Sequence, residues 1–150
     1  MAKSEFSHRL REGGRTMDEL NAEDHDSIRR AGQELHRQGW RTVFTLDEMM
    51  RKWTWFVGAV ERGYTDNVFE YINDNMCRDW IEKAWPLLTE RVRTAHQLEL
   101  ETLDTRFRAA TREDVDNALQ IRGFSGYWWQ RRLPLRRIGE FARGVGDPTD

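Results

Sequence analysis

The chain has 150 residues, of which 38% are hydrophobic and 33% charged, and a formal net charge of −2; a chain of this length fits one domain that buries roughly 70% of its unfolded surface, so it needs no disulfide or metal ion to hold it together. The single cysteine, Cys77, cannot form an internal disulfide, which favours a reducing compartment, and we expect a cytoplasmic protein. The charged N-terminal residues do not resemble a secretory signal peptide, and no apolar run approaches the roughly 20 residues that a transmembrane segment needs, so neither is expected.

We expect residues 1–40 to form an N-terminal extension with one helix. Residues 1–15 carry mixed charges, end in a Gly-Gly pair and lack a periodic apolar face, which predicts a flexible arm. A helix is predicted to begin at Thr16, because Thr16 and Glu19 have the spacing of a capping box. The apolar stripe that follows is sparse, and Gly39 is the predicted stop.

The next segment, about residues 45–63, has the clearest helical pattern of the chain. Thr45 and Glu48 again have capping-box spacing, and Gly63 follows the last apolar residue. Apolar residues recur at steps of three and four, the spacing of one buried helix face: Leu46, Met49, Met50, Trp53, Phe56, Val57 and Val60. We assign both Trp53 and Trp55 to the core.

A third helix is predicted from residue 65 or 66 to Pro86, where the missing amide ends it or begins the next helix. Its inward line is predicted to be Val68, Ile72, Met76, Trp80 and Ala84. A parallel line at four-residue spacing is predicted to be a solvated ridge of salt bridges: Glu70, Asp74, Arg78 and Glu82. Carboxylates interleaved with an arginine on one helix favour that interpretation over acid–base catalysis.

The remaining elements complete a helical protein. A fourth helix over about 87–110 has an inner face of Leu88, Val92, His96, Leu100, Leu103 and Phe107. A short helix is predicted over 111–120, another with Leu135, Ile138 and Phe141 on one side, and a disordered tail over 144–150. We therefore predict an all-α antiparallel helical bundle of about four to six helices, with residues 41–143 as the bundle domain.

Five motifs between residues 53 and 134 carry a family resemblance. They are Trp53-x-x-Phe56-Val57-x-x-Val60-Glu61-x-Gly63-Tyr64, Glu70-Tyr71-x-Asn73-Asp74, Arg78-Asp79-x-Ile81-Glu82, Arg106-Phe107-Arg108-Ala109-Ala110-Thr111 and Tyr127-Trp128-Trp129-x-Arg131-x-Leu133-Pro134. In these motifs the chain resembles a group of short bacterial all-helical proteins. The resemblance covers roughly residues 44–135 and implies that the helical body is a unit to which residues 1–40 are an extension. It implies no activity and supplies no catalytic or binding residue.

His96 is the strongest candidate for metal chemistry, with Glu99 one turn further along and Glu61 as a ligand from another helix. Metal sites in helical bundles converge three or more ligands, usually with a Glu-x-x-His pattern, and here the order is reversed. We therefore favour a histidine at the edge of the core, hydrogen-bonded to a helix neighbour, and expect no metal or other cofactor. A metal-dependent or small-molecule enzyme centred on His96 remains the first alternative.

The segment from residue 127 to 143 combines aromatic and basic residues, with five arginines, one glutamate and a net charge of +4. Arginine and tryptophan are enriched at the energetic centres of protein interfaces. The predicted partner-binding residues are Trp128, Trp129, Arg131, Arg132, Arg136 and Arg137. The competing interpretation is that the two tryptophans fold back to close the bundle while the arginines pair with acidic helix faces.

These patterns favour a non-enzymatic protein that acts through macromolecular interaction, with an unknown protein partner or by self-association. A regulator that contacts nucleic acid through the C-terminal arginines is a further alternative. A pI near 6.1 weighs against that alternative, because nucleic-acid-binding domains are usually strongly basic. A membrane surface is disfavoured by Pro134, which interrupts the segment.

Overall fold

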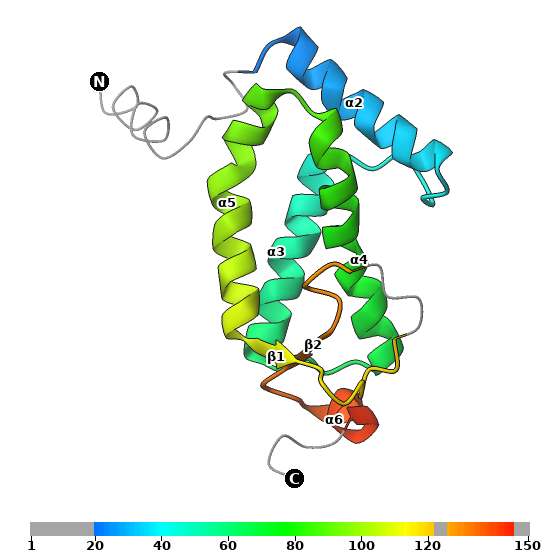
Figure 1. Cartoon of the computed structure of the whole chain (residues 1–150), viewed down its shortest axis with the longest axis vertical. Helices are drawn as coiled ribbons and strands as arrows, with labels where there is room; N and C mark the ends of the chain where they lie inside the picture. Colours follow the sequence, from blue (N-terminus) through cyan, green and yellow to red (C-terminus); the bar gives the residue numbers. More distant parts are fainter. Residues whose placement is uncertain (1–19, 122–125, 146–150) are drawn as a thin grey trace, which may run out of the picture. The chain divides into compact units, whose positions relative to one another are not determined.

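The structure is a computed structural model that describes residues 20–121 and 126–145. The described elements are α2 (Ala22–Arg37), α3 (Leu46–Arg62), α4 (Val68–Ala84), the 3-10 turn η2 (Trp85–Leu87), α5 (Glu90–Ala109), β1 (Thr111–Glu113), β2 (Arg132–Pro134) and α6 (Gly139–Val145). Figure 1 labels the α-helices and the two strands. The predicted all-α helical bundle is confirmed, with one two-stranded sheet added. The predicted flexible arm lies outside the described residues, and of the predicted tail only residues 144 and 145 are described, as the end of α6.

The described chain divides into two compact units, and each is described by itself below. The first unit contains residues 20–49 and 80–102, and the second contains residues 50–79, 103–121 and 126–145. Helices α3, α4 and α5 contribute residues to both units. The boundary near residue 40 stays a prediction. None of the described helices is long and apolar enough to cross a membrane.

The first unit is organised around α2, which begins with a capping box at Asn21. The Asn21 side chain accepts from the Asp24 amide and the Asp24 carboxylate accepts from the Asn21 amide, both at 2.9 Å. The predicted start at Thr16 lies outside the described residues. After α2, the chain turns back so closely that a Cβ at Gly32 would lie 2.2 Å from the Phe44 carbonyl oxygen. The buried hydrophobic residues of this unit include Leu35, Phe44, Leu46, Trp80, Ile81, Leu88 and Val92.

The second unit is built on packed aromatic rings. The ring centroids of Trp53 and Phe107 are 5.0 Å apart, and Tyr71 lies 5.2 Å from Phe56 and 5.0 Å from Phe141, so these contacts join α3, α4, α5 and α6. Rings at such distances attract one another beyond the hydrophobic gain of their burial. The predicted apolar face of α3 is confirmed, since all seven of its residues are buried.

The prediction that Trp55 belongs to the core is wrong, because 55% of its surface is exposed. Two residues along a helix correspond to a rotation of about 200°, which puts Trp55 on the face opposite Trp53. Two tryptophans at this spacing cannot both face the same core.

Helix α4 also differs from prediction. Within its second-unit part, Met76 is exposed and Val68 and Ile72 are only half-buried, whereas Tyr71, Asn75, Cys77 and Arg78 are buried. The predicted inward line is therefore wrong by one residue, a rotation of about 100°, at this end, although the predicted burial of Trp80 and Ala84 is confirmed. The pattern failed because polar residues occupy buried positions and apolar residues occupy exposed ones.

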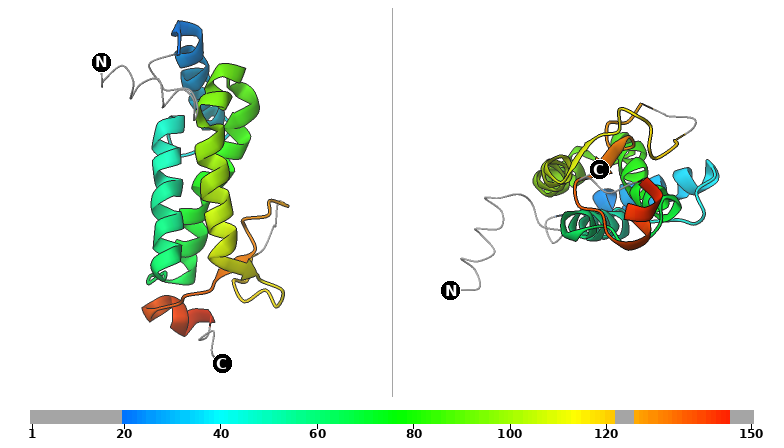
Figure 2. Two further views of the ribbon diagram at one scale, coloured as in Figure 1. Left: turned by 90° about the vertical axis from the view of Figure 1, so that its left-hand side faces the viewer. Right: turned by 90° about the horizontal axis from the view of Figure 1, so that it is seen from below.

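Residues 111–120 form strand β1 and turns, not the predicted short helix, and β1 pairs with β2 in a hairpin. Strands β1 and β2 pair antiparallel, with Thr111 opposite Pro134 and Glu113 opposite Arg132, and lie side by side at the end of α5 in Figure 2. A tight turn follows β1 because the Asp114 carboxylate accepts from the amides of Ala118 and Leu119, at 2.7 and 2.9 Å. Asp114 thus satisfies amides that a helix would have paired internally.

Candidate interaction surface

Residues 126–138, the core of the predicted contact segment, are anchored to the second unit by their own backbone. The Trp129 carbonyl accepts from Asn75 Nδ2 at 2.9 Å, and the Arg132 carbonyl accepts from the Tyr71 hydroxyl at 2.7 Å. The Leu135 amide donates to the Ala110 carbonyl at 3.0 Å, the bond that follows the β1–β2 pairing. The segment is therefore an integral part of the fold.

Trp129 is a core residue, because only 1% of its surface is exposed. The prediction that it contacts a partner is therefore wrong. Its indole Nε1 donates to Asp79 Oδ1 at 2.6 Å, and the Gln130 side chain donates to the other oxygen of the same carboxylate at 2.8 Å. The guanidinium carbon of Arg78 lies 4.2 Å from the centre of the Trp129 ring. For this residue the interpretation that the tryptophan closes the bundle is the one the structure supports.

Arg78 belongs to a buried polar cluster that the sequence pattern did not reveal. The residue is 5% exposed and binds Asp104 in bidentate fashion, with Nε to Oδ1 at 3.0 Å and a terminal nitrogen to Oδ2 at 2.9 Å. Trp53 Nε1 also donates to Asp104, at 3.1 Å. The prediction of a solvated ridge is wrong at Arg78, because its four-residue spacing from Asp74 and Glu82 resembles an exposed salt-bridged face. One feature of the sequence could have indicated buried polar residues in this helix: the run of poor helix formers Asn73-Asp74-Asn75. Its last residue, Asn75, is buried beside Trp129.

Trp128 and three arginines of the segment are half-buried. The guanidinium carbon of Arg108 lies 3.8 Å from the centre of the Trp128 ring, a cation–π contact. Arg132 is half-buried and donates from Nε to the Thr111 hydroxyl at 2.8 Å. Arg131 and Arg137 are also half-buried and engaged in contacts, the latter with the Pro134 carbonyl at 3.0 Å.

The exposed end of the segment adjoins a surface hollow of about 330 Å³, lined by Val60, Glu61, Arg106, Ala109, Ala110, Leu135 and Arg136. Leu135 is 46% exposed and Ile138 is 50% exposed, with the exposed Arg136 between them in sequence. Ile138 lies over Gly63, where an added Cβ would come within 2.5 Å of Ile138 Cδ1. Leu135 and Arg136 thus place an apolar side chain and a cation in the lining of the depression, and Ile138 adds a second exposed apolar side chain two residues further along the chain.

Glu61 lines this hollow and is held by Arg106, which lines it as well. Two hydrogen bonds of 3.0 and 2.6 Å join the two side chains. The bonds from Arg106 lower the pKa of Glu61, although its burial acts in the opposite direction. Glu61 is therefore an ion-pair partner here, and not the metal ligand considered from the sequence.

His96 has the environment that the sequence favoured for it. The ring is buried, and Nδ1 lies 3.0 Å from the Val92 carbonyl one turn earlier. Glu99 is exposed on the same helix, while Glu61 belongs to the other unit. Across residues 20–121 and 126–145, no three His, Cys, Asp or Glu side chains come together as a metal site would require.

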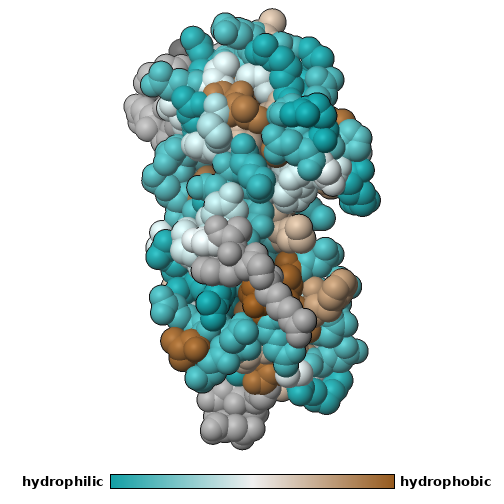
Figure 3. All heavy atoms as spheres, turned by 45° about the vertical axis from the view of Figure 1, so that its right-hand side comes forward, coloured by the Kyte–Doolittle hydropathy of each residue, from teal (hydrophilic) through white to brown (hydrophobic). Residues whose placement is uncertain are grey.

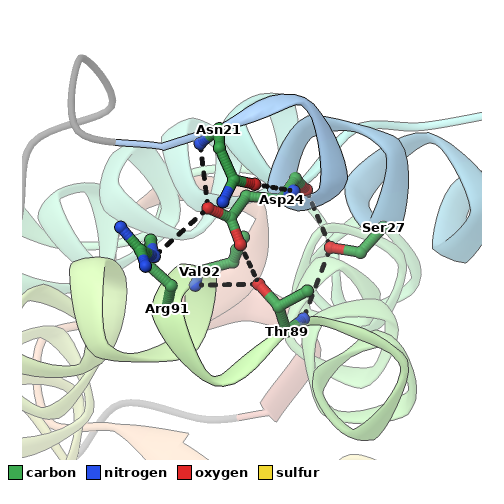
Figure 4. A network of polar contacts seen from close by, with 6 residues as sticks. All are labelled: Asn21, Asp24, Ser27, Thr89, Arg91 and Val92. Carbon is green, nitrogen blue, oxygen red and sulfur yellow. Dashed lines mark hydrogen bonds and ion pairs between the residues drawn. The ribbon is translucent and has the colours of Figure 1, made fainter.

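A second polar network, in the first unit, joins the beginnings of α2 and α5 (Figure 4). Asp24 accepts from the Thr89 hydroxyl at 2.6 Å and forms an ion pair with Arg91 at 3.4 Å. The Ser27 hydroxyl accepts from the Thr89 amide at 3.3 Å. A surface depression of about 460 Å³ adjoins this network. Both carboxylate oxygens of Asp24 are used within the network, which gives it a structural role in linking the two helices.

The structure thus separates the predicted contact residues into three groups. Trp129 is buried, Trp128 and three arginines are half-buried, and Arg136 is exposed beside Leu135 and Ile138. Sequence reasoning missed Leu135, Ile138 and Arg108 as surface residues of this region. Comparison with known proteins finds no matching family model, no matching curated protein and no matching solved structure.

Proposed function

We propose that this protein acts by binding another protein, without catalysis, and that it does so in the cytoplasm. The contact surface would consist of Leu135, Arg136 and Ile138 together with the hollow beside them. The observation that carries the proposal is the exposure of Leu135 and Arg136 in the lining of that hollow, with a second exposed apolar side chain, Ile138, two residues after Arg136.

The chemistry of this surface favours a protein partner over the other classes considered. Leu135 and Ile138 supply apolar area that gains free energy when a partner removes it from water. On the face drawn in Figure 3, hydrophobic residues form separate patches in a mainly hydrophilic surface. Leu135 lines the hollow together with the cation Arg136. Arginine is enriched at the energetic centre of protein interfaces, and the apolar side chains near Arg136 would add hydrophobic free energy when a partner covers them.

The charge of this surface specifies the partner further. Arg136 makes no ion pair with any carboxylate of residues 20–121 or 126–145, and the segment around it carries five arginines to one glutamate. A partner that presents an apolar side chain next to a carboxylate would satisfy both features. The apolar side chain would enter the hollow, and the carboxylate would pair with Arg136.

Affinity capture followed by binding measurements tests the proposal. The bait proteins are the unmodified chain, Leu135→Ser, Arg136→Gln and, as a matched control, Leu98→Ser, which changes an exposed leucine of α5 in the first unit. Proteins that the unmodified chain and the control retain, and that Leu135→Ser loses, are then purified and titrated by calorimetry. Truncating a central interface residue costs about 2 kcal/mol or more, so Leu135→Ser should weaken binding by about thirtyfold.

The salt dependence separates the roles of the two residue types. Arg136→Gln should mainly slow association and flatten its dependence on ionic strength, since the charge acts before contact. Leu135→Ser should mainly speed dissociation. If the captured proteins bind Leu135→Ser and Leu98→Ser equally well, the surface is not the contact site. Sedimentation of the protein alone identifies self-association, which would replace a foreign partner by a second copy.

A further inference from the structure

We infer that Arg108 and Arg132 form a binding site for a phosphate group, on the side of the second unit where α5 meets the β1–β2 hairpin. This site is separate from the hollow beside Leu135 and does not depend on the proposed function. The inference rests on two observations. Neutral groups hold both guanidinium groups in place, and no carboxylate of the described residues forms an ion pair with either of them.

Arg132 is held in place by neutral groups. Its Nε donates to the Thr111 hydroxyl at 2.8 Å, and one terminal nitrogen lies 3.2 Å from the Thr111 carbonyl and 3.4 Å from the Arg108 carbonyl. All three acceptors are uncharged oxygens, so they fix the guanidinium without neutralising it. The other terminal nitrogen donates to no acceptor within the described chain.

Arg108 is held by an aromatic ring. Its guanidinium lies against Trp128 at 3.8 Å, and Trp128 is itself fixed edge-on against Trp129 at 5.6 Å. A ring face positions the planar guanidinium but leaves the N–H donors at its rim available. Among residues 20–121 and 126–145, no carboxylate forms an ion pair with either Arg108 or Arg132.

The two positive charges lie close enough to oppose each other. Burial, and after it the charge of Arg108, lower the pKa of Arg132, while Glu113 on the opposite strand acts in the other direction. Glu113 pairs with Arg132 across the hairpin but makes no hydrogen bond with it. Holding two like charges together, each fixed by neutral groups, is unfavourable for the empty protein, and an anion between them removes the repulsion.

The geometry favours a phosphate group as that anion. Guanidinium groups bind phosphate oxygens through two parallel hydrogen bonds, which are shorter and stronger than bonds between neutral groups. A phosphate carries enough oxygens and charge to engage two guanidinium groups together, whereas a single carboxylate is neutralised by one. The phosphate could be a free ion or part of a nucleic acid strand, and the two sources differ in what else the surface must contact.

Titration with three probes at constant ionic strength tests the site: inorganic phosphate, pyrophosphate and a fifteen-residue oligothymidylate. Sodium chloride replaces each probe to keep the ionic strength fixed, because screening alone changes Tm. The Nε–H resonance of Arg132 and the indole N–H resonance of Trp128 report occupancy independently of stability. We expect at least one probe to shift both signals saturably and to raise Tm above the chloride control, since a ligand that binds only the folded state stabilises it.

The matched variants are Arg108→Gln, Arg108→Lys and Arg143→Gln. Arg108→Gln removes one charge but keeps the backbone carbonyl that contacts Arg132, so the hairpin bonds stay intact. It should weaken probe binding about tenfold or more, and Arg108→Lys should restore only part of the affinity, because an ammonium lacks the fork of donors. Arg143→Gln removes an exposed charge on α6 and should bind like the unmodified chain.

The probes also identify the source of the phosphate. Saturable binding of the oligonucleotide that is tighter than that of pyrophosphate, and lost in Arg108→Gln, assigns the site to a nucleic acid strand. Binding of phosphate and pyrophosphate without the oligonucleotide assigns it to a small anion. The inference is overturned if no probe exceeds the chloride control, or if Arg143→Gln weakens binding as much as Arg108→Gln does.

Discussion

At the scale of single residues, the ion pair of Arg78 and Asp104 shows why a buried charge differs from a surface charge. Removing two charges from water costs several kcal/mol each, and their attraction repays this cost only when the geometry is good. Here two hydrogen bonds join the pair, and Trp53 donates a third to the carboxylate. The cluster is therefore sensitive to the loss of one partner more than to the loss of both.

Asp104→Asn should lower the free energy of unfolding by about 3 kcal/mol, because it leaves the Arg78 charge buried without a counterion. The double change Arg78→Met with Asp104→Leu should cost less than the single change, since no charge is then left buried. Urea unfolding of both variants measures this difference. Glu99→Gln, an exposed change on the same helix, is the control and should stay within about 0.5 kcal/mol. A double variant less stable than Asp104→Asn would contradict the prediction.

Trp55 and Trp129 differ most clearly in how accessible their rings are to quenching ions in the solvent. In variants that keep Trp55 or Trp129 as the single tryptophan of the chain, iodide should quench Trp55 strongly and leave Trp129 unquenched until the protein unfolds. Lys52 and Arg62 are exposed on the same helix as Trp55, so the anion iodide should quench it more than the cation caesium does. Equal quenching of Trp55 by the two ions would show that these cations do not shape the potential around the ring.

At the scale of elements, the close contact between α2 and the segment before α3 depends on one glycine. Exchanging a glycine for alanine inside a helix usually stabilises it by up to about 1 kcal/mol. At Gly32 the added Cβ would meet the rigid Phe44 carbonyl at 2.2 Å, whereas at Gly58 of α3 it would meet the flexible end of Arg62 at 3.1 Å. The sign of the effect should therefore differ between the two positions.

Gly32→Ala should destabilise the protein by about 1–3 kcal/mol, as overpacking does. Gly58→Ala should stabilise it by about 0.5–1 kcal/mol, because the Arg62 side chain moves aside at little cost. Urea midpoints of the two variants, made in the same background, measure both effects. If the two changes have the same sign, the turn between α2 and α3 is looser than the structure describes.

The link between α2 and α5 should make the first unit sensitive to acid. The hydrogen bond from Thr89, followed by the one from the Asn21 amide, lowers the pKa of Asp24 from its ordinary value of 3.8. A carboxyl group whose pKa is lowered by folding contributes stability above its ordinary pKa, and that contribution is lost as the pH falls through the lowered value. Thr89→Val should raise the pKa of Asp24 and shift the loss of stability to higher pH.

Carbon-13 NMR titration of the Asp24 carboxyl in the unmodified chain and in Thr89→Val measures this pKa directly. Thermal unfolding between pH 2 and pH 6 measures the accompanying change in Tm. Thr94→Val, which changes a residue in the wall of the same depression without a hydrogen bond to Asp24, is the control. An unchanged Asp24 titration in Thr89→Val would show that Thr89 does not hold the carboxylate.

At the scale of the whole molecule, the sequence predicted the helices well where apolar spacing alone decides burial. Helix α3 follows its predicted face from Leu46 to Val60 because every inward position is apolar. In α4 the inward positions include Asn75 and Arg78, whose burial depends on partners 26 or more residues away, so local spacing gave the wrong face. The hairpin was missed because strands of three residues are stabilised by their pairing and leave no periodic pattern.

The candidate surface was predicted in part for the same reason. The composition of residues 127–143 located the region, but it could not distinguish the buried Trp129 from the half-buried Trp128, since the distinction depends on Asp79 and Asn75 as partners. Arg108 escaped notice because its role arises only when the hairpin brings it to Trp128 and Arg132. Contacts between distant segments decided each of these cases.

The aromatic core of the second unit has a consequence for how the protein is made. Phe56 and Tyr71 are synthesised early, yet Phe141, which packs against Tyr71, is added 70 residues after it. At about 5–20 residues per second, the ribosome needs on the order of ten seconds for that interval. During this time the nascent chain exposes rings that later become fully buried, which makes it a substrate for chaperones that bind hydrophobic segments.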